Sequence, residues 1–138
     1  MPTTYGQDLS TALSGLDSAL TVTAGTTQVG SSADLGTVPQ PHAVAAQFAL
    51  TQSGTNDQAD LTVKVQFSDD NSAWPDEGEG MVIFGWKADS AGGDLGASNI
   101  LRFIPNARYF RFVFENGNGT DDFDVDSEYA PIQWQDDT

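Results

Sequence analysis

The sequence predicts an all-β fold: an antiparallel β-sandwich of jelly-roll or immunoglobulin-like type, with about seven to nine strands. Two observations carry this prediction. Short segments alternate between apolar and polar residues, and turn-forming residues separate them. The length agrees, because 138 residues suit a single domain with one core. We expect residues 18–138 to form this domain and residues 1–17 to form an N-terminal arm or short helix.

Two segments are the firmest predicted strands. Leu61–Phe67 has apolar residues at every second position, and Arg108–Glu115 has phenylalanine at every second position. Such a period of two is typical of a strand with one buried face. Weaker patterns predict further strands over Ala19–Thr23, Gln28–Leu35, Ala43–Thr51, Met81–Trp86, Ile100–Ile104, Phe123–Tyr129 and Ile132–Trp134.

The breaks between these strands are rich in residues that favour turns. Glycine, asparagine and aspartate tolerate the left-handed backbone conformations that tight turns require. The clearest breaks are Ser53–Asp57, Asp69–Ser72, Ala91–Asp94 and Asn116–Gly119.

The N-terminal segment is compatible with two structures. Leu9, Leu13 and Leu16 fall at helical spacing, but Gly15 costs such a helix about 1 kcal/mol relative to alanine. The alternative is an extended arm in which the same leucines contact this or a neighbouring subunit.

The charge of the chain limits its partners. Twenty acidic and five basic residues give a formal net charge of −15. Such a surface repels nucleic acid and anionic membranes, so we expect neither as a partner. Basic or neutral protein surfaces and cations remain, although the charge also serves solubility alone. The chain has no cysteine, and neither a signal peptide nor a membrane-spanning segment is recognisable in it.

No catalytic constellation stands out in the sequence. The single histidine, His42, cannot build a histidine-rich zinc site and is expected at the surface beside a turn. Acidic pairs are abundant, and a glycosidase would need two carboxylates facing each other across a cleft. In so acidic a chain such pairs are weak evidence. We therefore expect no enzymatic activity, no catalytic residues and no cofactor.

One acidic segment has a regular pattern. On a strand, Asp122, Asp124, Asp126 and Glu128 share one face, and their mutual repulsion makes them weak candidates for calcium ligands. The segment lacks the EF-hand pattern. We expect instead the solvated face of an edge strand, where charge blocks pairing with other chains. A basic stripe on a partner is a third alternative.

Trp74 lies in a glycine- and glutamate-rich loop, residues 74–80. A loop tryptophan can anchor an interface or stack on a sugar. It can equally fold back over an open end of the sandwich.

Four segments together resemble a recurrent pattern in small virion proteins of tailed bacteriophages. They are Ser31–Gly36, Ala59–Val65, Val65–Trp74 and Asn106–Arg111, in the family's order. The insert after Trp74 and the acidic C-terminal segment depart from the pattern.

This resemblance implies a non-enzymatic capsid decoration or cement protein. Such a protein would bridge subunits of the major capsid protein on the capsid surface, as a homo-oligomer, with a trimer expected. It would be made in the host cytoplasm without a signal peptide. The residues expected to make contact are Tyr5, Leu9, Leu13 and Leu16 of the arm, together with Trp74.

Three alternatives stay open. A neck or tail component would use the same fold at another place on the virion. A carbohydrate-binding adhesion module would expose Trp74 or Trp134 beside polar groups. A small acidic glycosidase would need a cleft. The fold does not choose among them, because sandwiches host many functions.

Overall fold

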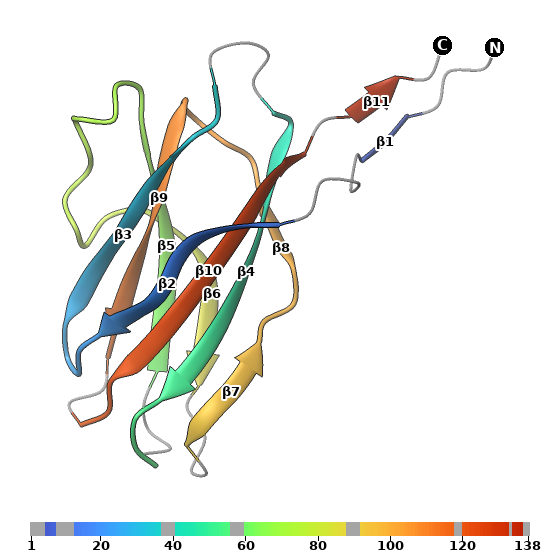
Figure 1. Cartoon of the computed structure of the whole chain (residues 1–138). Coiled ribbons are helices and arrows are strands. Elements are labelled where there is room, and N and C mark those ends of the chain that lie inside the picture. The colour runs from blue at the N-terminus through green and yellow to red at the C-terminus, as the bar shows by residue number, and fades with distance from the viewer. Residues whose placement is uncertain are drawn as a thin grey trace.

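The computed structural model describes residues 13–36, 41–55, 60–87, 92–117 and 120–132 in full, and the backbone of residues 5–7 and 134–136. The prediction of an all-β sandwich is confirmed, because the described residues form strands and no helix (Figure 1). The strands are β1 (Tyr5–Gln7), β2 (Ser14–Val22), β3 (Thr27–Asp34), β4 (Ala43–Gln52), β5 (Asp60–Ser68), β6 (Met81–Lys87), β7 (Gly93–Ala97), β8 (Leu101–Phe103), β9 (Tyr109–Asn116), β10 (Phe123–Ile132) and β11 (Trp134–Asp136).

Two antiparallel sheets face each other. One has the order β2-β10-β4, with β7 and β8 both pairing along the far side of β4, and the other has the order β3-β9-β5-β6. If β7 and β8 are taken as two halves of one strand, eight strands remain. Every connection between them crosses from one sheet to the other, except the one from β5 to β6. This is the strand order of a jelly roll.

Aromatic side chains fill the space between the sheets. The ring of Phe48 on β4 lies 4.9 Å from that of Phe112 and 6.0 Å from that of Phe114, both on β9. All three are fully buried, and both contacts are edge-to-face, the geometry that the ring quadrupoles favour. The alternation of Arg108–Glu115 therefore identified the inner face of the second sheet correctly.

One side of the sandwich is sealed where edge strands β2 and β3 meet. The carboxylate of Asp17 on β2 accepts hydrogen bonds from the backbone N–H and hydroxyl of Ser31 on β3. A Cβ atom on Gly30 would lie 2.6 Å from Asp17 Oδ2, so glycine permits this approach. Irregular pairing interrupts both strands, which protects these edges against pairing with other chains.

The opposite side is open. There β6 and β7 are the outer strands of the two sheets, and neither pairs beyond its single neighbour among the described residues. β7 contains Gly93 and Gly96 in left-handed conformations and was not predicted, because the first lies in a segment that the sequence marks as a turn.

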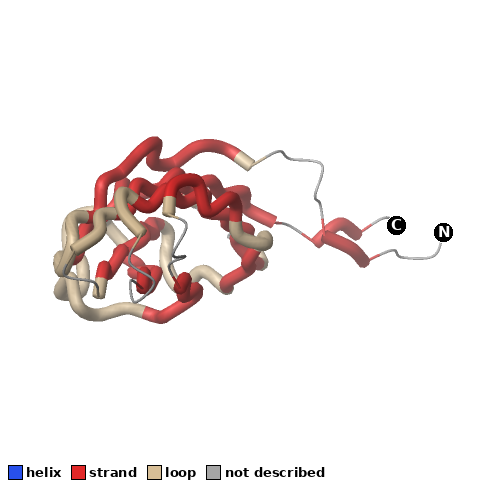
Figure 2. The backbone as a smooth tube through the Cα atoms, turned by 90° about the horizontal axis from the view of Figure 1, so that it is seen from below, coloured by secondary structure: helices blue, strands red, loops and turns tan. Residues whose placement is uncertain are grey.

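The two ends of the sandwich differ. At one end, which we call the terminal end, Ala43 pairs with Ile132 and Ser68 pairs with Tyr109. At the other, the distal end, Gln52 pairs with Phe123. β1 and β11 form a two-stranded antiparallel ribbon that belongs to neither sheet and extends from the terminal end (Figures 1 and 2). We call it the terminal ribbon.

The sequence prediction for the N-terminus needs two corrections. The first sheet begins at Ser14, so residues 14–17 belong to the sandwich and not to an arm. The short helix through Leu16 is wrong, because Leu16 lies on β2 and packs against the core. Hydrogen bonding to β10 outweighs the helical spacing of the leucines. Leu9 lies outside the described residues.

Replacing Asp17 by alanine is expected to lower the free energy of unfolding by about 1–2 kcal/mol, because two donors of Ser31 lose a charged acceptor at a partly exposed site. Urea denaturation measures the difference. Ser18→Ala, an exposed change on the same strand, is the control and is expected to leave stability nearly unchanged. Equal stabilities of the two variants would contradict the role given to Asp17.

A second prediction concerns pH. The Arg108 guanidinium donates to both carboxylate oxygens of Asp34, at 2.8 and 2.9 Å, and the Gly36 N–H donates to Oδ1. Together these bonds lower the pKa of Asp34 from 3.8 to about 2. A depressed pKa in the folded state stabilises the fold above pH 3.8, and the contribution is lost as the pH falls through about 2. Asp34→Asn should therefore flatten the stability curve in this interval, measured by urea denaturation at each pH. An unchanged curve would contradict the assignment.

Candidate functional site

The terminal end carries a hollow lined mainly by apolar side chains, which we call the apolar hollow. It has a volume of about 450 Å³. Ile104, just after β8, is 77% exposed, and Met81, at the start of β6, is 48% exposed. The other apolar lining residues are Val65, Phe67, Pro75 and Pro105.

The exposure of Ile104 follows from its position on the chain. Phe103, its neighbour, is buried in the core, so Ile104 must point the other way, and Pro105 prevents the strand from continuing. Two large exposed apolar side chains in one hollow are unusual on the surface of an isolated soluble protein. The apolar hollow therefore has the character of a protein contact.

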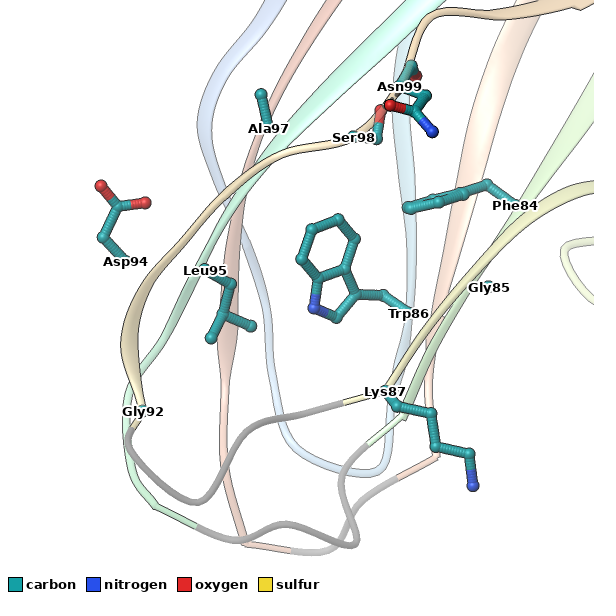
Figure 3. A pocket seen from close by; sticks show the side chains of 10 residues that line it. All are labelled: Phe84, Gly85, Trp86, Lys87, Gly92, Asp94, Leu95, Ala97, Ser98 and Asn99. Atoms are coloured by element: carbon teal, nitrogen blue, oxygen red, sulfur yellow. Dashed lines mark hydrogen bonds between the residues drawn. The ribbon is translucent and has the colours of Figure 1, made fainter.

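A second hollow lies on the open side, between β6 and β7, towards the distal end. We call it the aromatic groove, and it has a volume of about 600 Å³. Figure 3 shows the indole ring of Trp86 at its centre, with Phe84 and Leu95 on either side. The rings of Phe84 and Trp86 meet at 5.5 Å, nearly edge to face. Polar residues, among them Lys87, Asp94, Ser98 and Asn99, complete the lining.

Sequence reasoning missed Trp86 as a candidate site residue. It appears there only as the end of an apolar strand. The available signal was a pair of aromatic residues, Phe84 and Trp86, two positions apart at the end of a strand, which places both side chains on one face. The groove itself arises because β7, the strand opposite, is short and poor in side chains.

Trp74, which was expected in an exposed loop, lies against the outer face of the second sheet. The Arg111 guanidinium lies 4.4 Å from the centre of the Trp74 ring and donates to Gln66 Oε1. Gln66 Nε2 in turn donates to the backbone carbonyls of Asp76 and Glu79 in the same loop. The loop therefore folds back, but over a sheet face rather than over an open end.

Arg111 is partly withdrawn from water in this arrangement. Burial lowers the pKa of its guanidinium, and the negative charge of Glu77 opposes that shift. Trp74 is thus already in contact with a cation of its own chain, which makes it a poor platform for an external ligand.

The expectation that the acidic segment is an edge strand is wrong. β10 lies between β2 and β4 and pairs with both. Three carboxylates are satisfied by β2 and the turn after it: Asp126 accepts from the Ala19 N–H, Asp124 from the Thr21 hydroxyl and Asp122 from the Ala24 N–H. Asp124, Asp126 and Glu128 are exposed, so the prediction of a solvated face is confirmed.

Within the described part of the chain, no group of three or more histidine, cysteine, aspartate or glutamate residues could hold a metal ion. The physical reason is the strand itself. It spaces residues on one face by about 6.6–7 Å, so the four carboxylates cannot all reach one cation that lies about 2.3–2.6 Å from each ligand oxygen.

The structure separates the predicted arm contacts. Tyr5 lies on β1, although its side chain is not described, and Leu9 lies outside the described residues. Leu13 is half-buried just before β2, and Leu16 packs on the core. Trp134 begins β11. His42 is exposed, as expected, and its backbone N–H donates to the carbonyl of Ile132.

No helix among the described residues is long and apolar enough to cross a membrane. Comparison of the chain with protein-family models, with curated proteins and with solved structures finds no match.

Arg111→Met is expected to release the loop over residues 74–80, because the change removes the cation over Trp74 and the donor to Gln66. Cleavage by a glutamate-specific protease after Glu77 or Glu79 should then become faster, and mass spectrometry identifies the fragments. Arg102→Met, at an exposed position on β8, is the matched control. Equal cleavage of the two variants would contradict the conclusion that Arg111 holds this loop against the sheet.

Proposed function

We propose that this protein is a non-enzymatic structural component of a tailed-bacteriophage virion, a decoration protein that binds the major capsid protein through its terminal end. One observation carries the proposal. The apolar hollow and the terminal ribbon lie at the same end of the sandwich, and both are suited to protein contact.

The apolar hollow supports attachment through burial. Met81 and Ile104 are large, exposed and close to rigid strands, so covering them removes apolar surface from water at little entropic cost. Pro75 and Pro105 in the lining also have restricted backbones.

The terminal ribbon supports attachment through backbone pairing. Each of its strands has only three residues, and a two-stranded ribbon of this size is at best marginally stable in water. A third strand, from the capsid or from another copy of this chain, would pair with an edge of the ribbon that is unpaired among the described residues. A trimer around a local symmetry axis would multiply such contacts, so a modest affinity per site would suffice over a whole shell.

The acidic side chains of β10 lie on the outer face of the first sheet and not at the terminal end. It therefore contributes to solubility in this proposal and is not part of the contact. Attachment through the apolar hollow should accordingly persist in about 1 M salt, where the Debye length is about 3 Å.

The experiment uses purified phage particles that lack the protein and measures its co-sedimentation with them. Ile104→Glu is expected to reduce occupancy by tenfold or more, because a buried glutamate would have no counter-charge in the apolar hollow. Ile100→Glu is the matched control, since Ile100 is also exposed but lines neither hollow. It should attach as the unmodified protein does.

Wild-type occupancy by Ile104→Glu would contradict attachment through the hollow. Failure of the unmodified protein to bind any particle would contradict the decoration role itself. The number of copies in an intact particle separates the alternatives: hundreds indicate decoration, whereas a few at one vertex indicate a neck or tail component.

A further inference from the structure

We propose that the aromatic groove between β6 and β7 binds a neutral oligosaccharide, with Trp86 as the stacking platform and with Asn99 supplying hydrogen bonds. This site differs from the loop tryptophan that the sequence suggests, and its binding activity does not depend on the proposed attachment to a capsid.

The size and composition of the groove fit this ligand. A volume of about 600 Å³ lies within the roughly 300–1,000 Å³ of small-molecule sites. The C–H face of a sugar ring packs on an aromatic ring, while its hydroxyls need polar partners nearby. Figure 3 shows an indole at the centre and the side chain of Asn99 beside the aromatic rings, whereas the side chains of Lys87 and Asp94 point away from the indole.

One of these polar groups, the carboxamide of Asn99, lies where a ligand could meet it. The Asn99 carboxamide makes no hydrogen bond with another described residue, and Asn99 is exposed. Asp94 and Ser98, by contrast, are used within the fold: Asp94 Oδ1 accepts from the Gly96 N–H, and the Ser98 hydroxyl accepts from the Phe48 N–H. The hydrogen bonds of Asp94 and Ser98 therefore stabilise β7 and the segment after it, and Asn99 is the polar side chain left for a ligand among these residues.

The platform is held in place without a ligand. Trp86 packs against the core, its ring meets Phe84, and Phe84 stacks on Phe48 at 5.9 Å. A ring already fixed in this way loses little entropy when a sugar binds. In this respect Trp86 differs from Trp74, whose ring already contacts Arg111.

The charge of the protein selects the class of glycan. A net charge of −15 produces a negative potential that repels sulfated and uronic-acid glycans. Neutral hexose or N-acetylhexosamine chains carry no such penalty. The groove also lies towards the distal end, because β7 pairs with the Ala49–Gln52 part of β4, whereas the terminal ribbon continues from Ile132. A particle-bound copy would therefore keep it accessible.

The test measures tryptophan fluorescence of the full chain titrated with four neutral hexasaccharides, from cellulose, amylose, chitin and mannan, and with a heparin hexasaccharide. We expect a spectral change with at least one neutral probe and none with heparin. Trp86→Leu and Asn99→Ala should each weaken binding by about tenfold or more, measured by calorimetry because the first variant loses the reporter. Trp74→Phe is the control and should retain both the binding and the spectral change.

Asn99 is exposed, so its variant keeps the test valid if Trp86→Leu fails to fold. Binding of no neutral probe, binding that neither groove variant weakens, or equal binding of heparin would each overturn the proposal. Loss of particle attachment by folded Trp86→Leu or Asn99→Ala would also overturn it, since the groove would then be a protein contact.

Discussion

The contact between Phe48 and the phenylalanines of β9 holds the two sheets together, and the positions of both hollows depend on it. Phe48 meets Phe112 and Phe114 edge to face in the centre of the core. Among the connections between successive strands, only the one from β5 to β6 neither begins nor ends in the sheet that contains Phe48. The packing of these rings sets the separation of the two sheets, and each connection that crosses between the sheets must span that separation. The apolar hollow and the aromatic groove lie beside the short strands β8 and β7, whose side chains do not fill the space between the sheets.

The edge strands on the two sides of the sandwich differ: those on one side are protected against pairing with other chains, and those on the other side are not. Asp17 and Ser31 tie the edges of β2 and β3, and irregular pairing on both strands discourages further partners. The side formed by β6 and β7 has no such tie among the described residues. β6 is largely apolar, and an unprotected edge of this kind normally favours aggregation. An unprotected edge of β6 beside the aromatic groove is what we expect if this side of the sandwich serves as a binding surface.

The sequence predicts which face of a strand is buried better than it predicts the strand's neighbours. Leu61–Phe67 and Arg108–Glu115 coincide within a residue with β5 and β9, because a buried face imposes a period of two. The same pattern placed Asp124 and Asp126 on an exposed face. It did not reveal that β10 is a central strand, because the alternation of apolar and polar residues depends on which face is buried and not on which strands are paired. β7 has too few side chains to alternate, and its strand geometry comes from pairing with β4. The partners of Trp74 and Trp86 likewise depend on residues distant in the chain.

The central position of β10 has a consequence for the order in which the molecule can fold. β2 and β4 are synthesised early, yet they do not pair with each other, because the strand that joins them is the last of the sandwich. Before Phe123–Ile132 leaves the ribosome, the first sheet lacks its middle and the inner face of β9 lacks part of its cover. Folding must therefore wait for the C-terminal part of the chain, which makes it slow by topology. A ribosome that stalls before this strand would release a chain with exposed phenylalanines, a substrate for chaperones and proteases.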